Sequence, residues 1–265
     1  MTAFLASVSS LDEARVVADI ADVIDLKDPE AGALGALAPG RVREIVRWSA
    51  GRHVLSAALG DLPMRPHLIA DACEAMAASG VDFVKIGLFP DAACRTCIRA
   101  AAARTPEAAL VGVLFADQAP DLALLDEISS AGFAGVMLDT ADKRNGTLLN
   151  AMTEATLCAF VSRSHALGLF AGLAGSLRRG DIPLVLRCAP DFVGFRGALC
   201  EGHERRGRIS HDRARALAAQ IERRAGDRAS TMNRLRLART PRATSIDRHA
   251  ACVASMDAQA TGVAS

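Results

Sequence analysis

Short apolar runs alternate with amphipathic stretches along most of this chain. Apolar runs at residues 4–8, 23–28, 54–59, 83–88, 109–115, 135–140, 169–176 and 192–199 predict eight buried strands. Helical periodicity predicts helices at residues 41–50, 66–79, 92–104, 122–131, 149–167, 181–188 and 211–224, and Ser9-Ser10-Leu11-Asp12-Glu13 opens another after the first run. Eight strand–helix units predict an α/β protein with a (β/α)8 TIM barrel rather than a doubly wound sheet.

The repeating pattern ends at residue 224, and the segment after it differs in composition. Residues 225–265 are rich in Ala, Arg, Ser and Thr and offer little apolar sequence that would dock onto a core. We therefore expect a catalytic barrel domain over residues 1–224 and a flexible C-terminal extension over residues 225–265.

Charge and hydropathy exclude several classes of protein. A net charge of +1 supplies no field that would attract nucleic acid or an anionic membrane surface. No apolar run approaches the roughly 20 residues of a membrane span, and the N-terminus lacks the basic segment of a secretory signal. We expect a cytoplasmic protein.

The seven cysteines are odd in number and dispersed, which argues against a secreted disulfide framework and favours reduced thiols. Cys94 and Cys97 form a lone CxxC pair without a second pair at zinc-site spacing. We interpret this pair as helix packing or solvent exposure rather than metal binding or redox chemistry, and we assign neither the thiols nor the six histidines to a metal site.

Lysine is rare in this chain, with three lysines against 28 arginines. Arginine stays protonated, whereas a desolvated lysine amine can lose its proton and attack a carbonyl, so Lys27, Lys85 and Lys143 mark candidate chemistry. Their equal spacing of 58 residues places them on the second, fourth and sixth predicted strands or just beyond. Alternate barrel strands share layers of inward side chains, so we expect the three amines to meet at the C-terminal rim.

Two carboxylates accompany these lysines. Asp25 lies two residues before Lys27 and shares its face of the strand, and Asp139 ends the sixth predicted strand. A single such pair is more often a buried ion pair. Three crowded amines favour loss of a proton from at least one of them, which would make it competent to form a Schiff base, but spacing does not identify which.

The seventh and eighth predicted strands end in glycine-rich sequence. TIM barrels commonly bind phosphate in these loops through backbone N–H groups, so we predict that Gly175, Ser176 and Gly197 bind a substrate phosphate together with Arg196. The alternative is that the glycines serve only turns and packing. Arg205, Arg206 and Arg208 are interpreted as residues of a solvated loop.

Five motifs in this order resemble one known family. They are Asp25-Leu26-Lys27-Asp28-Pro29, Val84-Lys85-Ile86-Gly87, Leu138-Asp139-Thr140, Leu173-Ala174-Gly175-Ser176-Leu177 and Gly194-Phe195-Arg196-Gly197-Ala198-Leu199-Cys200. Over residues 4–224 the chain resembles the (5-formylfuran-3-yl)methyl phosphate synthases. The resemblance implies a barrel that condenses two molecules of glyceraldehyde 3-phosphate into a furan aldehyde phosphate for methanofuran biosynthesis, without a cofactor.

The resemblance also implies individual roles. Lys27 corresponds to the Schiff-base residue and Lys85 to the proton-transfer base, while Asp25, Asp139 and Lys143 match further active-site positions whose separate roles stay open. Two alternatives remain at this point, a Schiff-base (class I) aldolase acting on a sugar phosphate and a non-enzymatic barrel that binds a phosphometabolite. All three interpretations predict a small-molecule partner, no nucleic acid and no membrane, and they leave a homo-oligomer open.

Overall fold

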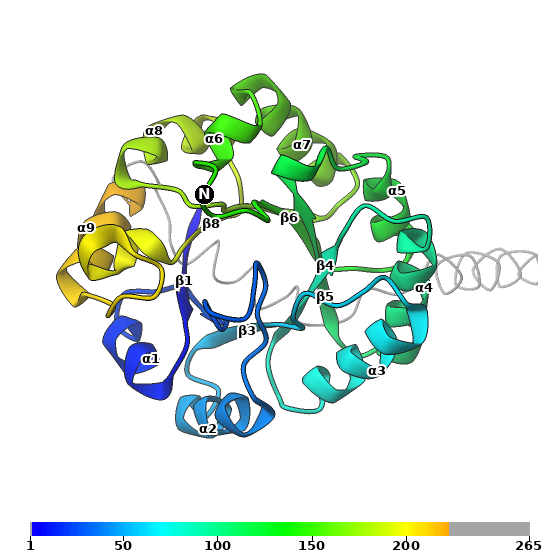
Figure 1. Cartoon of the computed structure of the whole chain (residues 1–265), viewed down its shortest axis with the longest axis horizontal. Helices are drawn as coiled ribbons and strands as arrows, with labels where there is room; N and C mark the ends of the chain where they lie inside the picture. Colours follow the sequence, from blue (N-terminus) through cyan, green and yellow to red (C-terminus); the bar gives the residue numbers. More distant parts are fainter. Residues whose placement is uncertain (1, 223–265) are drawn as a thin grey trace, which may run out of the picture.

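Eight parallel strands close into a barrel in the order β1 to β8, and helices surround the barrel (Figure 1). The computed structural model describes residues 2–222. The predicted (β/α)8 TIM barrel is thereby confirmed. The extension expected over residues 225–265 lies outside the described residues.

The strands are β1 (Ala3–Val8), β2 (Val23–Leu26), β3 (Val54–Ala58), β4 (Phe83–Leu88), β5 (Ala109–Phe115), β6 (Gly135–Asp139), β7 (Phe170–Leu173) and β8 (Phe192–Phe195). The helices are α1 (Leu11–Val17), α2 (Pro39–Ser49), α3 (Pro66–Ala77), α4 (Cys94–Arg104), α5 (Leu124–Ser130), α6 (Leu148–Ala151), α7 (Glu154–Ala166), α8 (Ile182–Val185) and α9 (His211–Glu222). Short 3₁₀ turns are η1 (Ala116–Gln118), η2 (Arg179–Asp181), η3 (Leu186–Cys188), η4 (Gly197–Leu199) and η5 (Glu201–His203). None of these described helices has the length and apolar character to cross a bilayer.

Strands β7 and β8 end earlier than the sequence predicts. Gly175 and Ser176 adopt positive φ angles of 113° and 50°, which a strand does not accommodate, so the chain turns after Leu173. The helix predicted over 149–167 is divided into α6 and α7, because Thr153 has extended backbone and its side chain caps α7. The last residues of these two predicted strands therefore lie in loops at the C-terminal rim.

Alternation along the strands divides the core into two layers. In β1, Phe4, Ala6 and Val8 pack in the layer between the strands and the helices, whereas Ala3 and Leu5 belong to a second apolar cluster inside the barrel. Both faces of the strands are covered, which explains why each strand reads as a continuous apolar run rather than as an alternation.

Aromatic rings fill the end of the barrel where the strands begin. Phe83, Phe170 and Phe192 open β4, β7 and β8, and the Phe170 ring lies 5.5 Å from Phe83 and 5.7 Å from Phe192, measured between centroids. A Cβ atom at Gly172 would lie 2.1 Å from the Phe192 ring, so the packing requires glycine there. Aromatic and apolar side chains fill the end of the barrel where the strands begin, so the polar side chains of the interior lie toward the C-terminal ends of the strands.

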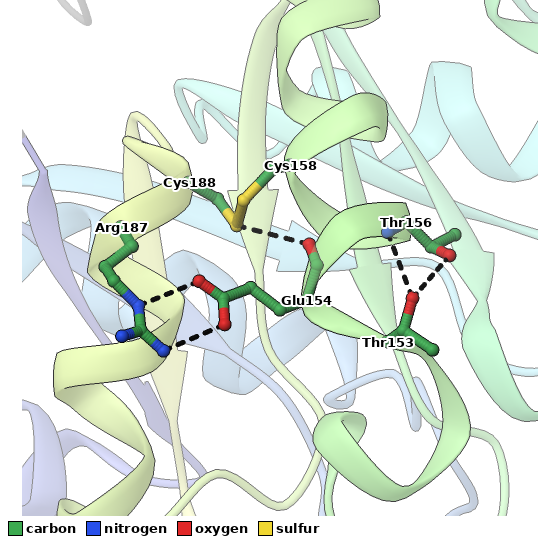
Figure 2. The surroundings of a disulfide bond; sticks show 6 residues. All are labelled: Thr153, Glu154, Thr156, Cys158, Arg187 and Cys188. Atoms are coloured by element: carbon green, nitrogen blue, oxygen red, sulfur yellow. Dashed lines mark hydrogen bonds and ion pairs between the residues drawn. A yellow bond between two sulfur atoms is a disulfide. The ribbon is translucent and has the colours of Figure 1, made fainter.

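A disulfide joins Cys158 of α7 to Cys188 of η3 (Figure 2). The sequence favoured reduced thiols throughout, and the structure corrects this for one pair. Nε and Nη2 of Arg187 bind the two carboxylate oxygens of Glu154 at 2.8 Å beside the bridge, so a covalent bond and an ion pair connect the same two elements. Cys94 and Cys97 are buried free thiols of α4, so of the two options that the sequence left open, helix packing holds and solvent exposure does not.

Removing the bridge should destabilise the barrel. The two cysteines are 30 positions apart, and the entropy of closing such a loop corresponds to about 3–4 kcal/mol. We expect the double variant Cys158→Ser/Cys188→Ser to lose about that much free energy of unfolding in urea titrations. The control Arg187→Ala removes only an exposed ion pair and should cost below about 1 kcal/mol. Equal stability of wild type and double variant, with no response of wild type to a reductant, would contradict a formed bridge.

Candidate active site

A pocket opens at the C-terminal ends of the strands. It is lined by all nine residues that the sequence singled out, which are Asp25, Lys27, Lys85, Asp139, Lys143, Gly175, Ser176, Arg196 and Gly197. The structure therefore brings together both predicted groups, the lysine–aspartate set and the phosphate-binding set. Their chemical roles depend on the contacts inside the pocket.

The strand register fixes Asp25 between two serines. Ser7 of β1 and Ser56 of β3 are its neighbours across the ladder. Their hydroxyls donate to the Asp25 carboxylate, Ser7 Oγ to Oδ2 at 2.8 Å and Ser56 Oγ to Oδ1 at 2.7 Å. Asp25 is only 1% exposed, so these bonds replace the water that a buried carboxylate lacks. The carboxylate is held in one orientation.

Lys85 lies deeper in the barrel than the sequence suggested, on the third residue of β4 rather than at the strand end. Its Nζ is 2.5 Å from Asp25 Oδ1, and its side chain is almost fully buried. Burial lowers the pKa of Lys85, and the attraction of Asp25 opposes this shift without reversing it. The amine is thereby brought closer to the neutral form, in which it can accept a proton.

Asp139 ends β6 and bridges the other two lysines. Lys27 Nζ, just past β2, lies 3.2 Å from Asp139 Oδ2, while Lys143 Nζ and the backbone N–H of Thr140 donate to Oδ1. Burial opposes ionisation of Asp139, but the Lys143 and Lys27 ammonium groups outweigh burial and hold its pKa well below the usual range. Asp139 is therefore a carboxylate shared by two amines.

Lys143 follows β6 by four residues and is mostly buried. Burial lowers the pKa of Lys143 to about 8, in spite of the attraction of Asp139. A group with a pKa near neutrality exchanges protons readily at physiological pH. Lys143 thus has the properties of a proton carrier at the mouth of the pocket.

Backbone donors face the pocket after β7. Within the described part of the chain, the N–H groups of Gly175 and Ser176 donate to no protein acceptor. A Cβ atom at Gly175 would approach Thr140 to 3.0 Å, and the positive φ angle there favours glycine. Unpaired N–H groups in a pocket form a cradle for an anion.

Arg196 lines the pocket, but its guanidinium is bound to protein groups. Its Nη1 and Nη2 donate to the Glu13 carboxylate at 2.6 and 3.0 Å, and its Nε donates to the carbonyl oxygen of Arg205 at 2.8 Å. Burial opposes ionisation of Glu13, but the bond from Arg196 outweighs it and lowers the Glu13 pKa, which keeps the pair charged. Arg196 therefore ties the start of α1 to the loop after β8, and its predicted contact with a substrate phosphate stays a prediction.

The sequence interpretation missed Arg205. This residue lines the pocket and is half-buried, so its assignment to a solvated loop is wrong, whereas Arg206 and Arg208 are exposed as expected. The segment from 196 to 210 contains only short turns, and no periodicity in the sequence indicates which of its arginines points inward. The closeness of three arginines in a long loop was the sequence feature that could have indicated an anion-binding residue there.

The closed barrel, with its pocket at the C-terminal ends of the strands, places the chain in the TIM-barrel class of folds. Solved barrels superimpose on it, among them 3-hexulose-6-phosphate synthase, with a TM-score of 0.60 and 16% identity over 83% of this chain and all of that chain. Phosphoribosyl anthranilate isomerase from Thermus thermophilus has a TM-score of 0.60 and 17% identity over 84% of this chain and 99% of its own. At such identities the likeness shows the fold alone.

Sequence comparison shows the family. The family model described as 4-HFC-P synthase matches residues 4–218, so the chain belongs to the (5-formylfuran-3-yl)methyl phosphate synthase family. A relative of that name from Methanopyrus kandleri is 37% identical over 236 residues, which cover 82% of this chain and 98% of the relative. A relative from Methylorubrum extorquens is 45% identical over 226 residues, covering 85% and 93%. The protein is accordingly an enzyme with a small-molecule substrate.

Proposed function

We propose that this protein condenses two molecules of glyceraldehyde 3-phosphate into (5-formylfuran-3-yl)methyl phosphate, with release of inorganic phosphate and two molecules of water. The observation that carries the proposal is the meeting of three lysines and two aspartates in one pocket of a chain from this family. The reaction is that of a carbon–oxygen lyase acting on phosphates, and its product would serve methanofuran-type carriers of one-carbon units.

Lys27 is the proposed nucleophile. Its amine adds to the aldehyde of one triose phosphate, and loss of water from the adduct gives an imine. Asp139, 3.2 Å from the amine, orients it, and the proton that must leave the nitrogen before it attacks passes to solvent. Once protonated, the imine withdraws electrons from the neighbouring carbon and makes its hydrogen acidic.

Lys85 is the proposed base for that hydrogen. Burial lowers its pKa, and Asp25, fixed by Ser7 and Ser56, holds the amine in place. Removal of the proton gives an enamine, whose carbon attacks the aldehyde of the second triose phosphate. Loss of phosphate and water then closes the aromatic ring, so the steps require only amines and carboxylates of this chain.

Lys143 is the proposed proton donor. It is hydrogen-bonded to Asp139, and at neutral pH its ammonium can protonate the oxygen atoms that leave or accept charge. Because deprotonation removes the donor, we expect kcat/KM to fall as the pH rises through about 8, the pKa of Lys143.

The pH dependence should disappear with an arginine at this position. In Lys143→Arg the cation persists at every accessible pH, so kcat/KM should be lower at neutral pH but flat on the alkaline side. The measurement is a pH–rate profile from about pH 6 to about pH 10 for both proteins. An unchanged alkaline decrease in the variant would assign that ionisation to another group.

Product analysis separates the proposal from the two alternatives. An aldolase would stop after formation of the carbon–carbon bond and release a hexose bisphosphate, and a binding protein would leave the substrate intact. Incubation with glyceraldehyde 3-phosphate, followed by mass spectrometry and ultraviolet absorption, should show a furan aldehyde phosphate. A bisphosphate product that retains both phosphates would favour the aldolase.

A further inference from the structure

The proposed reaction places two phosphorylated molecules in one pocket, so two anionic groups need partners at the same time. Six lysine and arginine side chains, His203 and two carboxylates line the pocket, which leaves an excess of positive charge. The three lysines face Asp25 and Asp139, and Arg196 faces Glu13 outside the lining. Arg178 is exposed, which leaves Arg205 as the half-buried cation of the pocket without such a pairing.

Arg205 differs from Arg196 in how its donors are used. In the described part of the chain its guanidinium makes one hydrogen bond, from Nη2 to the carbonyl oxygen of Gly32 at 2.9 Å, and no carboxylate lies within 4.0 Å. Four of its five N–H donors therefore have no protein acceptor. Its positive charge still acts on the reacting groups, because it contributes to lowering the pKa of Lys143.

Two contacts hold Arg205 in this position. The Nε of Arg196 donates to the carbonyl oxygen of Arg205 and fixes its backbone. On the other side, Asp61 accepts the backbone N–H groups of Ala33 and Leu34 at 2.6 and 2.8 Å and so shapes the loop that presents the Gly32 carbonyl. The guanidinium is thereby fixed before any ligand enters, which reduces the entropy lost on binding.

The guanidinium and the backbone cradle make their contacts on different loops of the rim. It contacts the loop that follows β2, whereas Gly175 and Ser176 follow β7. A fixed guanidinium with free donors matches the oxygen atoms of a phosphate in a two-point contact. The cradle and the arginine thus supply two separate positions for anions.

We propose that Arg205 binds the phosphate of one triose phosphate at a second anion subsite, while the backbone groups of Gly175 and Ser176 hold the other phosphate. The proposal rests on the proposed function for the identity of the ligand. Arg196 then serves as a positioning residue, which holds Arg205 through its carbonyl oxygen.

Calorimetric titration with inorganic phosphate tests this subsite without turnover. We expect the wild type to bind two phosphate ions and Arg205→Met to weaken one of these two sites at least about tenfold, while Arg205→Lys, which keeps the charge but loses the fork, should show a smaller loss at that site. The matched control is Arg206→Met, since Arg206 is exposed and, among residues 2–222, pairs with Glu30 at 3.6 Å and with no other carboxylate. Its affinity for phosphate should stay within about twofold of wild type.

Turnover supplies a second measurement. The KM for glyceraldehyde 3-phosphate should rise at least about tenfold in Arg205→Met and stay unchanged in Arg206→Met. Two phosphate sites of wild-type affinity in Arg205→Met, or a single phosphate site in the wild type, would overturn the second subsite. If Arg205→Met does not fold, the phosphate affinity and the KM of Arg205→Lys provide the same test. A failure to form a furan, with phosphate binding still dependent on Arg205, would overturn only the proposed function.

Discussion

Replacing Lys27 with arginine is expected to lower kcat by about 10⁴-fold or more. The guanidinium keeps the positive charge beside Asp139 but cannot lose a proton and form an imine. The fold should survive, because Lys27 lies at the pocket rather than in the apolar core and arginine can still pair with Asp139. The measurement is the rate of furan formation at saturating glyceraldehyde 3-phosphate.

Two controls accompany this variant. Thermal unfolding and phosphate binding of Lys27→Arg should resemble those of the wild type, which would show that the pocket is intact. Arg206→Lys makes the reverse exchange at an exposed position and should leave kcat unchanged. Full activity of Lys27→Arg would rule out a covalent mechanism at this residue.

Replacing Lys85 with methionine should both destabilise the protein and abolish turnover. The change leaves the Asp25 carboxylate buried without its counter-charge, which typically costs about 3–5 kcal/mol of unfolding free energy. The proton-transfer base is lost as well, so furan formation should fall by about 10²-fold to 10⁴-fold. Urea titration and product analysis measure the two effects.

A second variant separates stability from catalysis. In Asp25→Asn/Lys85→Met the neutral amide can accept from the hydroxyl of one of the two serines, Ser7 or Ser56, and donate to the hydroxyl of the other, so most of the lost stability should return. Activity should stay absent, because the base is still missing. A double variant as unstable as the single one would show that Lys85 contributes through packing, and an active one would remove Lys85 from the mechanism.

The barrel could be predicted from sequence because its strands are covered on both faces and form continuous apolar runs. The same regularity located the candidate site. Strand alternation places Asp25 and Lys27 on one face, and the repeat of the βα units carries Lys85 and Asp139 to the same end of the barrel. Strand alternation and the βα repeat were therefore enough to predict that these lysines and aspartates share one pocket.

Contacts between distant loops could not be predicted in this way. The partnership of Glu13 with Arg196 and the bond from Arg205 to Gly32 join residues 183 and 173 positions apart. Helix and strand periodicity relate residues a few positions apart, so they predict neither of these contacts. The bridge from Cys158 to Cys188 is similar, since it depends on the packing of α7 against a turn that the sequence predicted as part of a helix.

Borohydride reduction in the presence of glyceraldehyde 3-phosphate, followed by peptide mapping, tests the central claim most directly. Reduction converts an imine into a stable secondary amine, so the residue that carried it retains the triose phosphate. The proposed mechanism predicts one modified peptide, with the adduct on Lys27 and with Lys85 and Lys143 unmodified. An adduct on Lys85 or Lys143 with Lys27 free, or no adduct while furan is being formed, would contradict it.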